Sequence, residues 1–76
     1  MIKTTIKLTS IGDVQKFVNA VARFSGDVDL SSGRYVVDAK SIMGIFSLDL
    51  MQPVEMTIHS DNADNLLADV AEYIVK

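Results

Sequence analysis

The sequence predicts an α+β fold, in which a four-stranded antiparallel sheet carries three helices on one face. Apolar and polar residues alternate in residues 2–8 and 54–59, which is the period of a strand with one buried face. Apolar residues recur at spacings of three and four in residues 10–26 and 60–76, which is the period of an amphipathic helix. The 76 residues suffice for one modest core, so we expect a single domain over residues 1–76.

The N-terminal half supplies one strand, one helix and a hairpin. In residues 2–8 the side chains of Ile2, Ile6 and Leu8 fall on one side of the strand. The helix that follows is expected to end at Gly26, and its buried face is predicted to hold Val14, Phe17, Val18, Val21 and Phe24. Residues 27–39 are predicted to form two strands around a turn at residues 31–33, since glycine adopts the positive φ of tight turns.

The C-terminal half supplies a short helix, a strand and a longer helix. The apolar run of residues 42–51 is predicted to be the short helix. In the strand, Val54, Met56 and Ile58 point inward. The last helix is expected to start at a cap among residues 60–62, and its buried face is predicted to hold Leu66, Leu67, Val70 and Ile74.

Composition and charge exclude several classes of function. Seven basic and ten acidic residues give a formal charge of −3, and the basic residues are scattered, so we expect no nucleic-acid partner. Without cysteine there is no disulfide and no thiolate nucleophile. No apolar stretch approaches the length of a signal peptide or a membrane span, so we expect a cytoplasmic protein without a membrane partner.

Groups that could support catalysis or bind a metal are few. His59 is the single histidine, and we interpret it as a solvated surface residue because no second ligand or orienting partner is visible by spacing. The carboxylates of Asp61, Asp64 and Asp69 lack the pattern of a calcium loop, and no glycine array forms a nucleotide loop. We therefore expect no metal, no cofactor and no enzymatic activity.

The run from Ser41 to Met51 is the most informative stretch. Ser41 precedes the apolar residues, so it is predicted to cap the short helix, at an end where a phosphate would also be tolerated. Ile45 and Leu48 are predicted to pack on the sheet. Met43 and Phe46 face another direction, and one short helix cannot bury both pairs, so these two should remain partly exposed beside Ile42.

The predicted element order and the stretch "KSIMGIFSLDL" together resemble HPr, the histidine-containing phosphocarrier protein of the bacterial sugar phosphotransferase system. HPr proteins of low-GC Gram-positive bacteria open their second helix with a Lys-Ser-Ile-Met-Gly run, which residues 40–44 reproduce. The stretch "ARFSGDVDLSSGRYVVDAKS" also aligns with the family's hairpin without gaps. The resemblance implies an HPr-like open-faced sandwich of βαββαβα order.

The resemblance also implies a regulatory site. The serine at the position of Ser41 is phosphorylated in the family by an ATP-dependent kinase, and the residues around it dock partner proteins. Carried over to this sequence, the partner-binding residues are Lys40, Ile42, Met43 and Phe46. The implied partners are proteins: an HPr kinase/phosphorylase, and a transcriptional regulator or another protein of the sugar system.

The phosphocarrier site departs from the family. HPr has a Gly-Ile-His-Ala-Arg-Pro-Ala type motif between its first strand and first helix, where this sequence has "LTSIGDVQ". Ser10 falls near the histidine position, Gly12 near the arginine and Asp13 near the proline. A serine would form a stable ester instead of a transferable phosphoramidate, and Asp13 would repel the phosphoryl group.

Three functions remain compatible with the sequence. The first is a regulatory HPr-like protein that lacks the phosphocarrier histidine and keeps Ser41 and the docking residues, a combination known in natural HPr-like proteins. The second is a phosphocarrier with a non-standard acceptor such as His59. The third is an HPr fold recruited for an unrelated interaction, in which Ser41 serves only as a cap.

Overall fold

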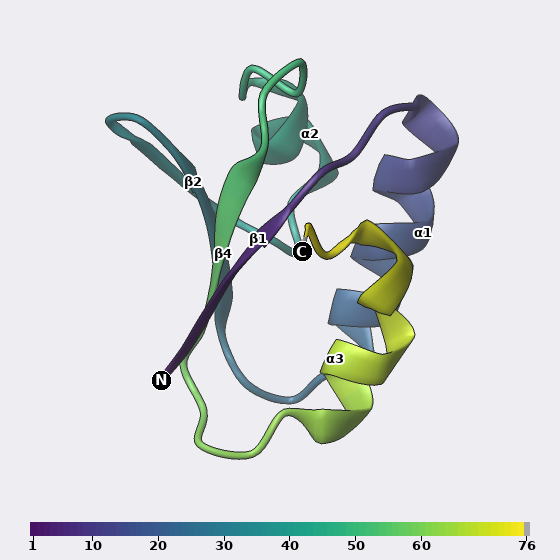
Figure 1. Ribbon diagram of the computed structural model, residues 1–76, viewed down its shortest axis with the longest axis vertical. Coiled ribbons are helices and arrows are strands. Elements are labelled where there is room, and N and C mark those ends of the chain that lie inside the picture. The colour runs from purple at the N-terminus through teal and green to yellow at the C-terminus, as the bar shows by residue number, and fades with distance from the viewer. Residues whose placement is uncertain (76) are drawn as a thin grey trace.

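The computed structural model describes residues 1–75, and it confirms the predicted order of strands and helices. The elements are β1 (Ile2–Ile6), α1 (Ile11–Ala22), β2 (Val28–Ser32), β3 (Tyr35–Asp38), α2 (Ile42–Phe46), β4 (Val54–Ile58), α3 (Asp64–Asp69) and the short 3₁₀ helix η1 (Ala71–Tyr73). The strands form one antiparallel sheet in the order β1-β4-β2-β3. The helices cover one face of this sheet (Figure 1).

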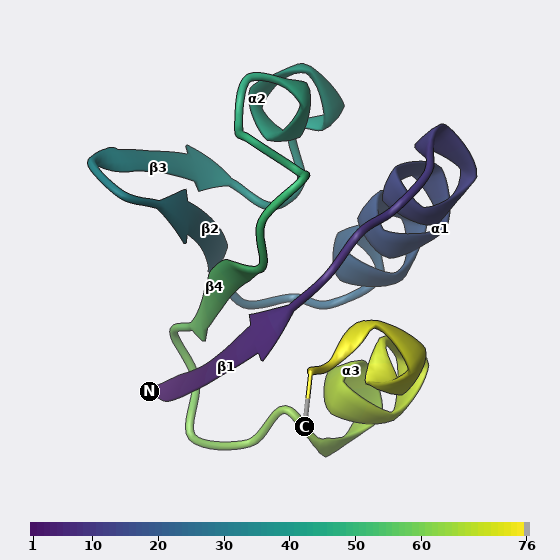
Figure 2. The ribbon, with the colours of Figure 1, turned by 45° about the horizontal axis from the view of Figure 1, so that its top comes forward.

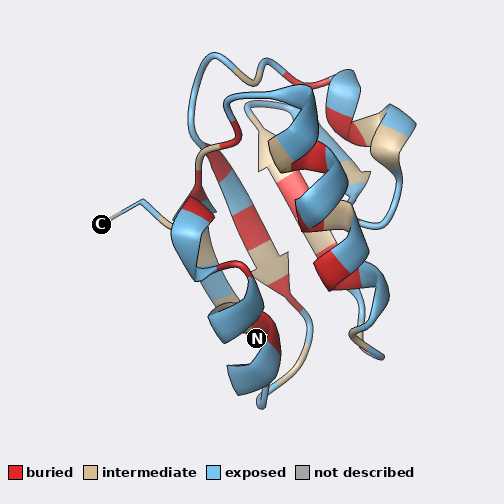
Figure 3. Cartoon of the chain, turned by 90° about the vertical axis from the view of Figure 1, so that its right-hand side faces the viewer, coloured by how far each residue is buried: buried red, intermediate tan, exposed pale blue. Residues whose placement is uncertain are grey.

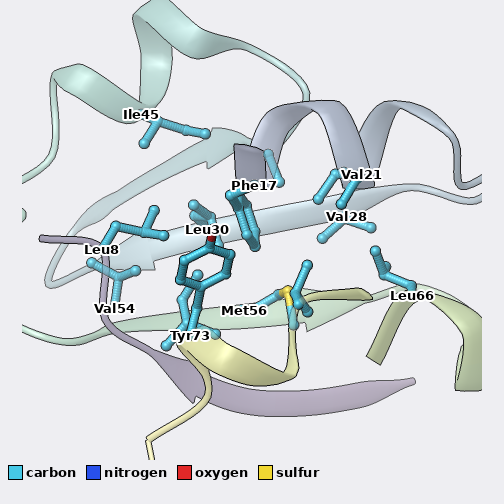
Figure 4. Packing of buried hydrophobic residues seen from close by; sticks show 14 of the residues in the cluster. Leu8, Phe17, Val21, Val28, Leu30, Ile45, Val54, Met56, Leu66 and Tyr73 are labelled. Carbon is cyan, nitrogen blue, oxygen red and sulfur yellow. The ribbon is translucent and has the colours of Figure 1, made fainter. Parts of the chain in front are cut away.

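The core lies between the sheet and the helices. Val54, Met56 and Ile58 of β4 are buried as predicted, because alternate side chains of a strand point to one face. Val14, Phe17 and the other buried residues of α1 meet them from the opposite layer. Figure 3 shows buried residues on the surfaces where sheet and helices face each other, and Figure 4 shows how these side chains pack.

The end of α1 differs from the prediction. The helix stops at Ala22, and the N–H of Arg23 donates to the carbonyl of Ala20 at 3.2 Å. This bond spans three residues, so the last turn tightens and satisfies its carbonyls without a left-handed residue. Gly26 is therefore not the cap, and among the described residues only Gly33 has a positive φ.

The hairpin turn lies one residue beyond the predicted position. Ser32 pairs with Tyr35, so Gly33 and Arg34 form a two-residue loop between β2 and β3. Gly33 has a φ of 60°, and no residue other than glycine has a positive φ in the described chain. A loop with a positive φ at its first residue, glycine, and a negative φ at its second residue is a type II′ turn. The backbone twist of this turn matches the twist of the two strands that it connects.

The second helix is shorter than the sequence predicts. It ends at Phe46, since the N–H of Ser47 and the N–H of Leu48 donate to carbonyls three residues back, at 3.1 and 3.0 Å. Asp49 then accepts from the N–H of Met51 in a turn. Leu48 is buried as predicted, but it lies in this turn and not on the helix.

The last helix was predicted incorrectly at both ends. It begins at Asp64 after Ala63, with no side-chain cap, whereas the hydroxyl of Ser60 bonds the backbone of Asn62 in the preceding turn. It ends at Asp69, and residues 73–75 pair with β1. The N–H of Val75 donates to the Thr5 carbonyl at 2.9 Å, an interaction that a continuous helix would forgo.

Tyr73 is a core residue that the sequence patterns did not identify. Its ring lies edge-on to that of Phe17, with the centroids 6.3 Å apart, and Figure 4 shows it among the core side chains. The hydroxyl is buried and has no hydrogen-bond partner among the described residues. Burial raises the pKa of Tyr73 to about 12, and the negative charges of Glu72 and Asp13 add to the rise.

Replacing Tyr73 by phenylalanine is expected to leave stability at pH 7 unchanged or to raise it by about 1 kcal/mol, because an unpartnered buried hydroxyl costs desolvation. The substitution should also change the pH dependence. Between the ordinary tyrosine pKa of 10.0 and about 12, the unfolded chain releases the Tyr73 proton and the folded chain keeps it. Stability should fall with rising pH across that window in the parent protein, and fall less in Tyr73→Phe.

The measurement is urea denaturation of both proteins from pH 7 to the alkaline limit. Tyr35→Phe is the matched control, because Tyr35 is 71% exposed. A loss of more than about 1 kcal/mol at pH 7 in Tyr73→Phe would mean that the hydroxyl makes a hydrogen bond.

Candidate functional site

The N-terminus of α1 is closed by a reciprocal cap. The Ser10 hydroxyl oxygen accepts from the N–H of Asp13 at 3.0 Å. The Asp13 carboxylate accepts in turn from the N–H and the hydroxyl of Thr9, at 3.1 and 2.8 Å. This is a variant of the capping box, in which a side chain three residues into the helix reaches back across its start.

The reciprocal cap places a fixed negative charge beside Ser10. The hydrogen bond from the Thr9 hydroxyl, followed by that from its backbone N–H, holds the pKa of Asp13 below the ordinary value. The carboxylate is therefore ionised at neutral pH. The three residues that the resemblance aligns with the phosphocarrier motif thus provide a serine hydroxyl used as a cap, an exposed glycine at position 12 and a carboxylate.

Ser41 caps α2, as predicted. Its hydroxyl oxygen accepts from the N–H of Gly44 at 3.1 Å, and its carbonyl accepts from the N–H of Ile45 at 3.0 Å. Asp38 orders the segment that leads into α2, because its carboxylate accepts from the N–H of Lys40 and its carbonyl accepts from the N–H of Ser41. Ser41 and Lys40 are both exposed, so a protein partner can reach the hydroxyl.

Gly44 positions this cap, a role that the sequence patterns did not reveal. A Cβ atom at Gly44 would lie 3.2 Å from the Ser41 hydroxyl oxygen and 3.3 Å from Cβ of Val37 on β3. Both distances are shorter than an ordinary van der Waals contact. The glycine therefore lets α2 approach β3 closely while Ser41 folds over the first turn.

The two faces of α2 have the exposures that the sequence predicts. Ile45 is completely buried and Leu48 is 6% exposed, whereas Met43 is 77% and Phe46 is 42% exposed. Ile42 is half-buried and packs against the core. One short helix thus anchors itself through Ile45 and presents Met43 and Phe46 to solvent.

A groove lies between Ser10, in the segment aligned with the phosphocarrier motif, and Phe46 of α2. It has a volume of about 700 Å³ and lies between the start of α1 and the end of α2. Ser10 and Ile11 line one side, and Phe46 and Met51 line the other. Ile11 and Met51 are strongly exposed apolar residues that the sequence patterns did not assign to the site. We use the name apolar surface for Ile11, Met43, Phe46 and Met51.

Lys7 fixes the loop that carries Met51. Its Nζ donates to the carbonyls of Leu50 and Met51, at 2.8 and 2.6 Å. Because Lys7 follows β1 directly, these bonds tie the loop after α2 to the strand that leads into α1. Lys7 thus holds in place the part of the groove wall that Met51 forms.

His59 lies away from this groove. It follows β4, whereas the loop that lines the groove precedes β4, so the length of the strand separates them. His59 is exposed as predicted, and its Nε2 lies 2.7 Å from Oδ2 of Asp29, a partner that the spacing did not reveal.

Two general properties of residues 1–75 complete the description. Within this range no cluster of three or more His, Cys, Asp or Glu side chains is arranged to hold a metal ion. The helices of the same range are all too short to span a membrane.

The chain is similar to known proteins over nearly its whole length. Residues 13–75 match a family model described as the "PTS HPr component phosphorylation site". The structure of HPr-C-His from Thermoanaerobacter tengcongensis has a TM-score of 0.79 and 25% identity, over 95% of this chain and 89% of that chain. The fold is also that of the phosphocarrier protein HPr from Bacillus anthracis str. Ames, with a TM-score of 0.73 and 24% identity over 97% and 96% of the two chains. The matched range begins at Asp13, so Ser10 and Gly12 lie outside it.

Proposed function

Since the chain belongs to the HPr family of the phosphotransferase system, we propose that it is a regulatory binding protein of that system. In this proposal it does not carry phosphoryl groups from enzyme I. It is instead phosphorylated on Ser41 by an ATP-dependent HPr kinase, and it binds its protein partners through the apolar surface. The observation that carries the proposal is the exposed Ser41 cap next to Met43 and Phe46.

The start of α1 supports the loss of phosphoryl transfer. A phosphocarrier needs an imidazole that is nucleophilic near neutral pH and whose phosphoramidate passes its phosphoryl group onward. The side chain nearest that position is Ser10, which caps the helix. A phosphoryl group there would face the ionised carboxylate of Asp13. The N–H and hydroxyl of Thr9 already donate to that carboxylate, so they are not free to bind the phosphoryl group.

The start of α2 supports phosphorylation of Ser41. A phosphate on this residue would lie at a helix N-terminus, where free N–H groups favour negative charge, and next to exposed Lys40. The new charge would border the apolar surface without entering the core, because Ser41 itself is exposed. Phosphorylation would therefore change what the surface binds and leave the fold intact.

The position of His59 speaks against its use as a substitute phosphoryl acceptor. Its Nε2 is engaged by Asp29, a carboxylate that would repel a phosphoryl donor. It also lies at the end of β4 remote from the groove and the apolar surface.

Two phosphorylation reactions, each followed by intact mass, test the proposal. With phosphoenolpyruvate and enzyme I, no acid-labile adduct is expected. With HPr kinase and ATP, one acid-stable phosphoryl group is expected on the parent protein and none on Ser41→Ala. Ser47→Ala, at the other end of α2, is the matched control and should be modified like the parent.

The outcomes separate the candidate functions. An acid-labile adduct from enzyme I would indicate a phosphocarrier with a non-standard acceptor, and mapping it to His59 would identify that acceptor. Absence of modification in both reactions would leave Ser41 as a helix cap and favour a fold recruited for another interaction.

A further inference from the structure

The two edges of the sheet are protected unequally. Along β1, the C-terminal segment pairs with the end of the strand, through a bridge between Ile6 and Ile74 and the bond from the Val75 N–H to the Thr5 carbonyl. The opposite edge is β3, which pairs with β2 on one side only. Figure 2 shows β3 at the margin of the sheet, and no other strand of residues 1–75 lies beyond it.

The free edge of β3 presents backbone groups and apolar side chains to solvent. Ser32 and Tyr35 close the two-residue hairpin loop, so they form a hydrogen-bonded pair, and such pairs alternate along an antiparallel ladder. The N–H and C=O of Tyr35 and Val37 therefore point toward β2, and those of Val36 point outward. Tyr35 and Val36 are 71% and 64% exposed, which is unusual for an aromatic and a β-branched residue on an edge.

From this edge we infer that the protein self-associates by antiparallel pairing of β3 with β3 of a second copy, centred on Val36. In this register each Val36 N–H donates to the carbonyl of the other Val36, since both point outward. The two sheets then form one continuous sheet about a twofold axis. The inference is independent of phosphorylation at Ser41.

Charge selects this register. With Val36 opposite Val36, Arg34 in the hairpin loop of each copy comes level with Asp38 at the end of β3 in the other copy, twice in the pair. If the register is shifted by two residues in either direction, Arg34 no longer lies opposite Asp38. On the other face Tyr35 lies opposite Val37 of the second copy, an aromatic and β-branched pair of the kind that stabilises sheets.

The self-association is expected to be weak. A four-residue strand buries little surface, which places the pair among small, transient interfaces. The Asp38 carbonyl also accepts already from the Ser41 N–H, so the flanking positions contribute mainly through their side chains. In the pair, both α2 helices lie on the same face of the continuous sheet, so two apolar surfaces are presented on one side.

A charge exchange tests the pairing by sedimentation equilibrium over a wide concentration range. Arg34→Glu alone places a second carboxylate opposite Asp38, and Asp38→Lys alone places a second cation opposite Arg34, so each variant should dissociate about tenfold or more readily than the parent. An equimolar mixture should associate like the parent, because the mixed pair restores opposite charges at both positions. Lys16→Glu, an exposed change of the same charge on α1, is the control and should not alter association.

Two results would overturn the inference: a parent protein that stays monomeric at millimolar concentration, or a mixture that associates no better than its components. Asp38 also orders the approach to α2, so Asp38→Lys is checked by circular dichroism. Should it fail to fold, Val36→Glu replaces it, since two carboxylates facing each other at this exposed central position would block the pairing.

Discussion

Replacing Ile45 by alanine is expected to lower the free energy of unfolding by about 2–5 kcal/mol, the usual cost of deleting a large buried aliphatic side chain. Ile45 is completely buried, and it is the only buried residue of α2. A helix of five residues has almost no intrinsic stability, so its position depends on this anchor. The loss is a large share of the roughly 5–15 kcal/mol that stabilises a small domain.

Met43→Ala is the matched control for Ile45→Ala on the same helix. Met43 is 77% exposed, so its removal should change stability by no more than about 0.5 kcal/mol. Urea denaturation monitored by circular dichroism measures both variants. Equal losses for the two substitutions would contradict the description of α2 as an element with one anchored face and one displayed face.

The displayed face of α2 could be predicted from the sequence because it follows from spacing alone. Ile45 and Leu48 are three residues apart, as are Met43 and Phe46, and only one of these pairs can face the sheet. The burial of alternate β4 residues was predictable for a similar reason, since the two-residue period assigns each side chain to a face.

The end of the last helix could not be predicted because a distant segment determines it. Residues 73–75 leave the helical pattern to pair with β1, at the opposite end of the sequence, and no local signal in the last stretch records that contact. The groove was missed for the same reason. Ile11 and Met51 line the same groove although they are far apart in the sequence, and the bond from Lys7 to the Met51 carbonyl that fixes one side forms only in the folded protein.

The hydrogen bonds of the reciprocal cap at α1 could not be predicted from the residue types that align with the family motif. The sequence indicated that histidine and arginine are absent near residues 10–13. It did not indicate that Ser10 and Asp13 bond across the helix start and recruit Thr9. The segment that the resemblance aligns with the phosphocarrier motif thus forms a cap at the start of α1.

Replacing Phe46 by alanine is expected to lower kcat/KM for phosphorylation of Ser41 by HPr kinase about tenfold or more. Phe46 is the aromatic residue of the apolar surface; it lines the groove and lies three residues after Met43 on α2. Central aromatic residues of interfaces commonly contribute about 2 kcal/mol or more to binding when truncated. Its side chain is 42% exposed, so the fold should tolerate the change better than it tolerates Ile45→Ala.

Val75→Ala is the control for Phe46→Ala, because Val75 is exposed to a similar extent, 44%, and lies beside β1. It should be phosphorylated at the parent rate. Met51→Ala extends the test across the groove, and a loss there would show that the kinase contacts both walls. If Phe46→Ala and Met51→Ala are both phosphorylated at the parent rate, the kinase does not use the apolar surface. The kinase would then recognise Ser41 through the polar residues Lys40 and Asp38 that precede α2, and the exposed apolar side chains would bind a partner other than the kinase.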